Sequence, residues 1–482
     1  MTLREQAISG VKWSGVSATA AAVLQFLQIV ILSWLLNPED FGLMAMIMVV
    51  IGFSEAFGDL GISNAIIYRQ ECTRDELSTL YWLNILTGAA IFLILWLITP
   101  VAVYFFNENK LRILLPLTAS TFLIMAIGKQ FQVLLQKNLQ FNRLSIIEVL
   151  SAVVGSGIAI FLAFLGNGVF SLIFGQIAKV TATVLFAGWL CLPAWRPRFH
   201  FRTADLRGYL GFGLYQMGER GINFLSSNVD YIMVGRYLGS EILGIYRIAY
   251  ELVVAPLVRV NPIIVRVAFP VFSKKQFDNT ALRHGYSEMI KLISTIAFPV
   301  MLGVGVTASL FIPVLFGEKW LEAIPLIQIL VPLGLFKMLS NPSGTVLLAK
   351  GRVEIGFLWN IFVALGNTLS FWWATQHGIQ YLAWTYAVLS LIQFVVISEA
   401  IVYRLIGFGL MDYIRVAFKP AVLSMIMALM VYVVYRIGVE LSINQTPLLC
   451  GIVTAGIGIY VGMLMFTERE YLNSIWRAIT TR

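Results

Sequence analysis

The chain has 482 residues, of which 59% are apolar and only 12% are charged. Because soluble domains carry about 25% charged residues, this composition excludes a soluble enzyme, a disordered regulator and a small disulfide-linked secreted domain. The mean hydropathy of +0.83 and the net charge of +9 instead indicate an integral membrane protein with basic segments between its spans.

Fourteen segments have the roughly 20 mostly apolar residues that a membrane-crossing helix needs. Their approximate ranges are 14–36, 41–60, 82–105, 111–128, 145–165, 168–191, 211–235, 242–267, 287–312, 320–348, 355–376, 379–402, 415–437 and 447–466. Breakers such as Asn37-Pro38 and His377-Gly378 separate them. Residues 1–13 form a short amphipathic lead-in, and the helix that follows is too long for a signal peptide. We therefore expect an all-α integral membrane protein.

The basic residues predict the orientation of these helices. Of the 34 Lys and Arg residues, 24 fall on the side that holds both termini, five on the opposite side and five within spans. The positive-inside rule then places both termini in the cytoplasm. We expect the basic loop 196–207 to lie against anionic lipid headgroups, so the net charge requires no nucleic-acid partner.

A short internal repeat relates the two halves of the chain. The segment 34–43 resembles the segment 237–246, and aligning Gly42 with Gly244 gives an offset of 202. The same offset aligns a polar helix stripe in the first half with one in the second half: Ser14, Ser17, Gln25 and Gln28 with Gln216, Glu219, Ser227 and Asp230. We predict two six-helix lobes (1–195 and 196–410), related by a pseudo-two-fold axis along the membrane normal, and two further helices in 411–482.

Five basic residues lie within predicted spans, where a charge costs about 2.5–3.5 kcal/mol. They are Lys179, Arg220, Arg247, Arg259 and Lys337. We expect them to face protein or water. Lys179 and Arg220 are central and lack an obvious partner one helical turn away. Arg247 can pair with Glu251, and Arg259 lies between two prolines where a broken helix would leave free carbonyl groups.

Acidic residues also occur in the spans. Glu55 and Asp59 lie near the cytoplasmic end of the second span, where we expect them to cap the loop, while Glu219, Asp230 and Glu251 lie deeper. A cationic, water-filled cavity suits an anionic substrate such as a phosphate or pyrophosphate. Prolines and glycines in spans eight to ten allow bending, which suits an alternating-access mechanism. The scattered cysteines and histidines predict neither a disulfide framework nor a metal site.

Several segments resemble the Wzx-type polysaccharide exporters, which belong to the superfamily of multidrug, oligosaccharidyl-lipid and polysaccharide exporters. They are MTLREQAISGVKW (1–13), EDFGL (39–43), DLGISNAII (59–67), LLQKNLQF (134–141), NPIIVRVAFP (261–270) and FGEKW (316–320). The chain is most similar to the colanic acid exporter subgroup, over about residues 1–440. These motifs lie at turns and helix ends, so they specify the scaffold more firmly than the substrate.

The resemblance implies a non-enzymatic flippase in the bacterial inner membrane. It would carry an undecaprenyl-pyrophosphate-linked oligosaccharide to the periplasmic leaflet for exopolysaccharide assembly, with a polymerase and a chain-length regulator as possible partners. By role and depth, the head group would be held by Arg220, Lys179 and Lys337, with Arg259 and Arg247 as further candidates. The resemblance implies no cofactor. Coupling to H⁺ or Na⁺ would use Glu219, Asp230, Glu251 or Asp59.

Other functions remain open at this point. An antiporter for cationic drugs would have a compact, acidic and aromatic pocket and usually twelve spans. A lipid II flippase would handle nearly the same head-group chemistry. A membrane polymerase or ligase would need a sizeable polar outer loop, which the chain lacks.

Overall fold

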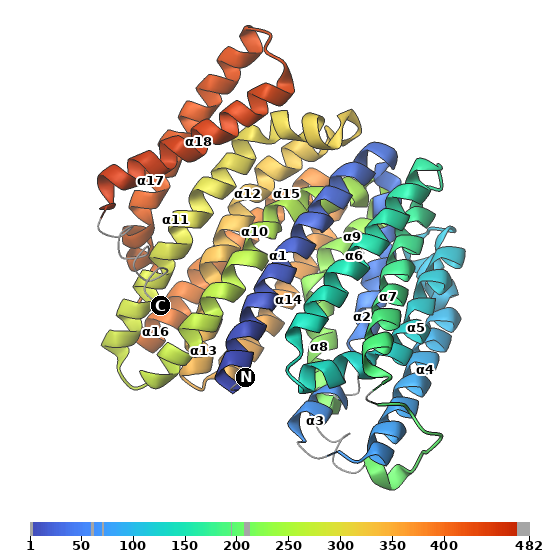
Figure 1. The fold of residues 1–482 in the computed structure, drawn as a ribbon. Coiled ribbons are helices and arrows are strands. Elements are labelled where there is room, and N and C mark those ends of the chain that lie inside the picture. Colours follow the sequence, from blue (N-terminus) through green and yellow to red (C-terminus); the bar gives the residue numbers. More distant parts are fainter. Residues whose placement is uncertain (1–2, 59–61, 70–71, 194, 207–212, 470–482) are drawn as a thin grey trace. The chain divides into compact units, whose positions relative to one another are not determined.

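The computed structural model describes residues 3–58, 62–69, 72–193, 195–206 and 213–469, and within these ranges it contains helices and no β-strand. The predicted all-α fold is therefore confirmed. The chain forms two compact units, Met1–Gly244 and Ile245–Arg482. Figure 1 colours the first from blue to green and the second from green to red.

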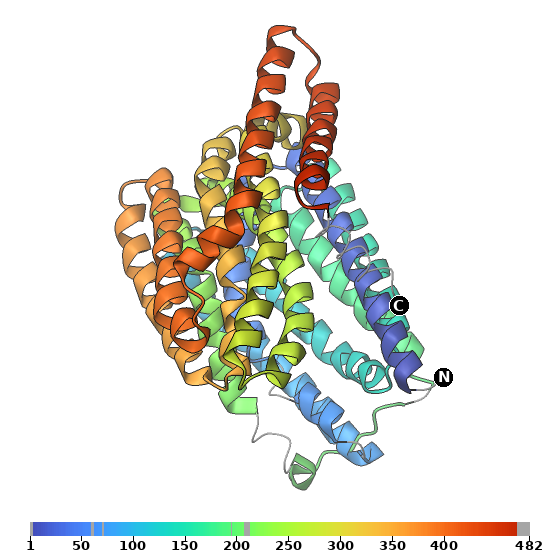
Figure 2. The same cartoon turned by 90° about the vertical axis from the view of Figure 1, so that its left-hand side faces the viewer.

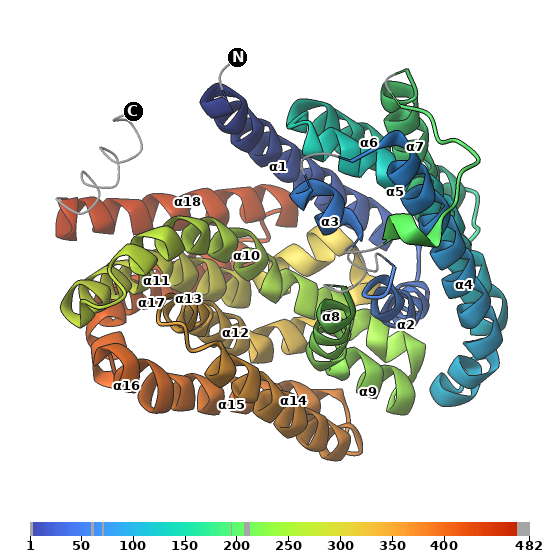
Figure 3. The ribbon, with the colours of Figure 1, turned by 90° about the horizontal axis from the view of Figure 1, so that it is seen from below.

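The first unit contains nine α-helices within its described residues, one short 3-10 helix at Thr203–Leu206, and the start of a tenth α-helix. Their bounds are α1 Leu3–Leu35, α2 Pro38–Glu55, α3 Ile62–Tyr68, α4 Arg74–Phe106, α5 Leu111–Lys137, α6 Phe141–Phe164, α7 Val169–Cys191, α8 Gly213–Ser227, α9 Val229–Tyr237 and α10 from Gly239. Helices α1, α6, α7, α5 and α4 pack in that order. Helix α2 packs against α5 and α7 and also against α8 and α9, beside which it lies in Figure 3.

The second unit contains the rest of α10, which ends at Lys274, and eight further α-helices. Their bounds are α11 Asn279–Phe311, α12 Ala323–Ser340, α13 Ser343–Ala349, α14 Val353–Thr375, α15 Ile379–Val396, α16 Tyr403–Ile406, α17 Leu410–Glu440 and α18 Gln445–Thr467. Helices α14, α15, α12, α11 and α17 pack in that order. Helix α18 returns along α17, and the pair forms the long hairpin seen in Figure 2.

Local sequence explains where several helices begin. At Asn37-Pro38, the Asn37 N–H donates to Asp40 Oδ2 at 3.0 Å, and proline occupies the first turn, where its missing N–H costs nothing. At the start of α4, Thr73 and Glu76 bond reciprocally in a capping box. Gly378, with φ of +107°, precedes α15. These boundaries agree with the predicted breakers.

Eleven helices in the described part of the chain are long and apolar enough to cross a membrane. The protein is therefore a multi-pass membrane protein, although fourteen spans remain a prediction. The predicted spans 41–60, 211–235 and 242–267 are not among the eleven. Helix α2 carries three acids, and the second range is divided at Asn228 into α8 and α9. Helix α10 covers the third, but part of its side chains lies outside the described set.

The two aligned glycines meet each other. A Cβ atom at Gly42 would lie 1.7 Å from the carbonyl oxygen of Ser240, and one at Gly244 would lie 1.8 Å from that of Pro38. Pro38 and Ser240 are themselves 202 residues apart, so the contact is reciprocal. Helix ends follow the same offset, because α1 ends at Leu35 and α9 at Tyr237. Only glycine permits the backbones to approach this closely.

The packing inside the two units also repeats. In the first unit α4 packs on α5, α5 on α7, and α6 on α7; in the second unit α11 packs on α12, α12 on α15, and α14 on α15. The same order of helices therefore forms the same neighbours in each half. The lobe boundaries at 195 and 410 stay a prediction, because the compact units divide within α10.

Two polar clusters tie segments outside the spans to nearby helices. Glu468, just past α18, pairs with Lys291 at 3.0 Å and with Lys419 at 2.8 Å. Partial burial raises the pKa of Glu468, but hydrogen bonds from the two lysines outweigh this and lower it overall. Asp205, in the segment after α7, accepts a hydrogen bond from Thr79 of α4 at 2.8 Å. This bond, supported by His200, lowers the pKa of Asp205.

Candidate functional site

Lys337 lies at the centre of a polar cluster in the second unit. It is the fifteenth residue of the 27-residue span Ala323–Ala349. Its Nζ donates to the hydroxyl of Tyr386 at 2.6 Å and to that of Tyr250 at 3.0 Å. Within the described part of the chain, no carboxylate lies within ion-pair distance of this amine. A half-buried cation is thus held at mid-span by neutral hydroxyl groups, which leave its charge uncompensated.

Aromatic rings support this arrangement. The Lys337 Nζ lies 4.6 Å from the centre of the Tyr386 ring and 5.3 Å from that of Tyr250. These two rings stack at 6.1 Å with an angle of 13° between their planes. Tyr246 and Phe371 extend the row at either end. The negative ring faces attract a nearby cation, so the two tyrosine rings contribute to holding the lysine in this position.

The other predicted cations of the second unit lie on α10. Arg247 Nε donates to Glu251 Oε1 at 2.8 Å, so the expected ion pair forms. Arg259 is exposed and has no ion-pair partner among the described residues. The expected break in this helix is wrong, because α10 continues from Gly239 to Lys274 through both prolines. Membrane helices tolerate proline where neighbouring groups satisfy the freed backbone.

The first unit carries Lys179 and Arg220. Lys179 is the eleventh of the 23 residues of α7, and Arg220 is the eighth of the 15 residues of α8. Both side chains are exposed, and neither forms an ion pair with a described residue. The backbone at Lys179 is fixed by close packing, because a Cβ atom at Gly155 of α6 would lie 2.6 Å from the Lys179 Cβ. Small residues allow such approach between membrane helices.

The predicted coupling acids have different surroundings. Asp230 is buried in the first turn of α9, where the positive end of the helix dipole favours a negative charge. Glu251 is held by Arg247. Asp59 and the side chain of Glu219 lie outside the described residues.

The polar stripe of α1 faces α6. Ser17 Oγ donates to Glu148 Oε2 at 3.2 Å, and Ser156 Oγ donates to Gln28 Oε1 at 2.7 Å. This part of the stripe therefore joins two helices of the first unit.

Glu55 lines a cavity that the sequence did not indicate. Asn84 and Lys129 line the same cavity. The expectation that Glu55 caps the loop stays a prediction, because residues 59–61 of that loop lie outside the described residues. Lys129 is one of the basic residues that we predict on the cytoplasmic side. Sequence reasoning also missed Tyr250 and Tyr386, because aromatic residues are common throughout the chain. The only signal in the sequence was the i, i+4 spacing of Tyr246 and Tyr250, which places these two rings on one face of a helix.

The profile of the family described as polysaccharide biosynthesis proteins matches residues 31–325, which is more than half of the chain. The chain belongs to this family. Teichuronic acid biosynthesis protein TuaB of Bacillus subtilis strain 168 is 34% identical over 442 residues, covering 92% of this chain and 90% of TuaB. Lipopolysaccharide biosynthesis protein WzxC of Escherichia coli K12 is 34% identical over 362 residues, covering 75% of this chain and 74% of WzxC.

The fold of this chain also resembles a solved structure. The lipid II flippase MurJ, in an inward closed conformation, superimposes with a TM-score of 0.75 over 96% of this chain and 100% of MurJ. The sequence identity is 15%, so this likeness concerns the fold. The predicted resemblance to Wzx-type exporters is confirmed by the family match and by the similarity to WzxC.

Proposed function

We propose that this protein is a flippase for undecaprenyl-pyrophosphate-linked oligosaccharides. It would move them from the cytoplasmic to the periplasmic leaflet of a bacterial inner membrane, for assembly into an exopolysaccharide such as colanic acid. The family match carries the proposal: relatives named for polysaccharide biosynthesis align over most of their length, and the fold is that of a lipid II flippase. A polymerase and a chain-length regulator would act after it.

The five basic residues within the predicted spans, here called the deep cations, would bind the pyrophosphate head group. An exposed charge facing lipid costs about 2.5–3.5 kcal/mol, so Arg220, Lys179 and Arg259 would line a water-filled path. Arginine binds phosphate oxygens with two parallel N–H bonds, and lysine acts as a point charge. Lys337 offers an uncompensated charge at mid-span, and Arg247 would join it by exchanging Glu251 for phosphate. Successive cations would hold the pyrophosphate as the path opens alternately to each side.

Coupling to H⁺ or Na⁺ would use one of the acids within the helices. Asp230, Glu251, Glu219 and Asp59 are the candidates. Glu251 accepts a hydrogen bond from Arg247 at 2.8 Å, so it would bind a coupling ion only after that pair opens. In this scheme arrival of the pyrophosphate at Arg247 would release Glu251, which links substrate binding to ion coupling.

The test compares cells that lack the protein with cells that carry Arg220→Ala or Lys179→Ala. We expect the lipid-linked oligosaccharide to accumulate in all three, with its sugars on the cytoplasmic face. Arg112→Ala is the matched control, because Arg112 is exposed at the start of α5, and it should accumulate none.

Two other results would reject the proposal. Increased sensitivity to cationic drugs without an accumulated lipid would identify a drug antiporter. Accumulation of lipid II with arrest of cell-wall synthesis would identify a lipid II flippase.

A further inference from the structure

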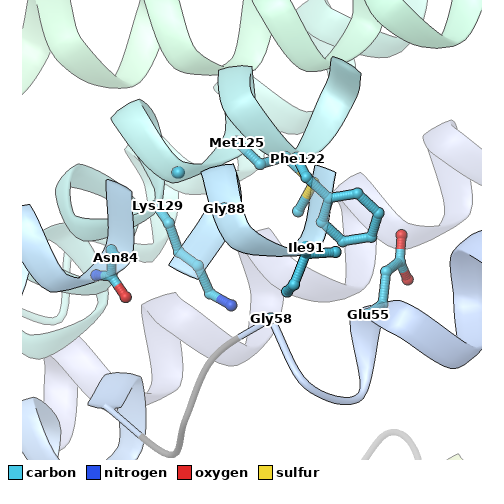
Figure 4. A pocket seen from close by; sticks show the side chains of 9 residues that line it. Glu55, Gly58, Asn84, Gly88, Ile91, Phe122, Met125 and Lys129 are labelled. Atoms are coloured by element: carbon cyan, nitrogen blue, oxygen red, sulfur yellow. The ribbon is translucent and has the colours of Figure 1, made fainter. Parts of the chain in front are cut away.

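A cavity of about 210 Å³ lies within the first unit, at the end that the charge distribution assigns to the cytoplasm. It is formed by the end of α2, the turn after it, and the facing sides of α4 and α5. The polar residues that line it are Glu55, Asn84 and Lys129. In Figure 4 Asn84 and Glu55 lie at opposite ends of the view with Lys129 between them.

Asn84 is the residue that points to a ligand in this cavity. It is only 5% exposed, and its Oδ1 atom has no hydrogen-bond partner among the described residues. A buried polar atom left without a partner costs about 1–3 kcal/mol. Asn84 lies on the cavity wall, so a ligand in the cavity that donates a hydrogen bond would remove this cost.

The cavity wall carries one acidic and one basic side chain, Glu55 and Lys129. A phosphate bound there would meet the carboxyl group of Glu55 as well as the ammonium group of Lys129, so the wall does not offer the cluster of cations that favours phosphate. Among the described residues, no group of three or more His, Cys, Asp and Glu side chains could hold a metal ion. A neutral ligand with several hydroxyl groups fits better, because the site offers both acceptors and a donor.

Apolar residues complete the wall. Ile91, Phe122 and Met125 line the cavity beside the polar groups, and an apolar surface of this kind packs against the C–H face of a sugar ring. The volume also limits the ligand, because drug-sized ligands occupy pockets of about 300–1,000 Å³. The smaller cavity has room for about one ring.

We propose that this cavity is a sugar subsite that binds one residue of the lipid-linked oligosaccharide. Asn84 Oδ1 and the Glu55 carboxylate accept hydrogen bonds from sugar hydroxyls, and Lys129 donates one. This inference rests on the proposed function and adds to it the part of the substrate that is recognised. The pyrophosphate is held elsewhere, by the deep cations.

The geometry supplies a variant that fills the cavity. A Cβ atom at Gly58 would lie 3.8 Å from Phe122 and 3.9 Å from Ile91, in ordinary contact with both. A leucine at this position extends its side chain into the space that the sugar occupies. Gly88 is unsuitable, because its Cβ atom would lie 2.6 Å from that of Ala126 and would separate α4 from α5.

The experiment uses the purified full-length protein and lipid-linked oligosaccharide extracted from cells that lack it. Binding of this lipid is measured in competition with inorganic pyrophosphate and with the free oligosaccharide released from the same lipid by mild acid. We expect Gly58→Leu and Asn84→Leu each to weaken binding of the lipid about tenfold and to abolish competition by the free oligosaccharide. Competition by pyrophosphate should be unchanged. Glu148→Gln, an exposed acid of the same unit, is the matched control.

The outcomes separate the two proposals. If the wild-type protein binds the lipid and both variants bind it equally well, the sugar subsite is wrong while the flippase stands. If the wild-type protein does not bind the lipid, the proposed function fails and the subsite fails with it. If Asn84→Leu does not fold, Gly58→Leu decides the question, because it leaves the buried amide in place.

Discussion

Lys337→Met is the substitution that best separates a role in transport from a role in folding. Methionine keeps an unbranched apolar side chain and removes the charge. Lys337 is half-buried at mid-span and donates to two tyrosine hydroxyls at 2.6 and 3.0 Å. The substitution therefore removes two opposing contributions to the free energy of unfolding: the stabilising hydrogen bonds to the tyrosines and the destabilising charge at bilayer depth.

Each hydrogen bond to a charged group contributes about 1.5–3 kcal/mol. The charge itself destabilises the protein by about 2.5–3.5 kcal/mol at bilayer depth, and the substitution removes this cost. The contributions partly cancel, so we expect Lys337→Met to lower the free energy of unfolding by about 1.5 kcal/mol and by no more than about 3.5 kcal/mol. Substrate binding has no such compensation. Loss of one ammonium–phosphate contact, about 1.5–3 kcal/mol, should reduce flipping by about 10- to 150-fold.

The assay measures flipping of the lipid-linked oligosaccharide in vesicles that contain the purified protein, together with thermal unfolding of each variant. Tyr250→Phe and Tyr386→Phe are the matched controls, because they remove one hydroxyl each and retain the charge. They should lose less than a factor of ten in flipping. A Lys337→Met protein that flips at the wild-type rate would refute the role in transport. Destabilisation beyond about 3.5 kcal/mol would show that the lysine is structural.

Three further predictions concern stability. Gly42→Ala should destabilise the protein by about 1–3 kcal/mol in thermal unfolding, because its Cβ atom meets backbone. Gly157→Ala, with open space around it, should stabilise the protein by up to about 1 kcal/mol. Equal effects of the two substitutions would contradict the close contact of Gly42 with Gly244. The lowered pKa of Glu468 means that its contribution, about 1 kcal/mol, is present above the ordinary value of 4.5 and is lost as the pH falls through the lowered value; Glu468→Gln should remove this loss from acid-unfolding curves. Thr79→Val should raise the pKa of Asp205 and speed tryptic cleavage after Arg202 severalfold; unchanged cleavage would mean that the bond does not hold the loop.

The sequence predicts much of this fold because helix ends depend on neighbouring residues. Asn37-Pro38 and Gly378 act through caps and fixed backbone angles within a few positions, and the structure begins α2 and α15 there. The repeat was also visible, because the offset of 202 appears directly in the residues. Composition alone identified a membrane protein.

The surroundings of the site could not be predicted in the same way. Lys337 is 87 residues from Tyr250 and 49 from Tyr386, so their contact depends on tertiary packing. The cavity beside Glu55 could not be predicted for a related reason, because α4 and α5 supply its other walls. The break expected near Arg259 does not occur, because membrane helices tolerate proline where neighbouring groups satisfy the freed backbone.

The reciprocal contact of Gly42 and Gly244 has the form of an interface in a two-fold homodimer, where residue i of one copy meets residue j of the other and j meets i. A single half of this chain would present the same surface to a second copy of itself. Because both segments belong to one polypeptide, each glycine can be substituted without changing the other. Gly42 nevertheless faces the carbonyl of Ser240, and Gly244 faces the carbonyl of Pro38. A larger residue in either segment therefore requires a compensating change in its counterpart 202 positions away.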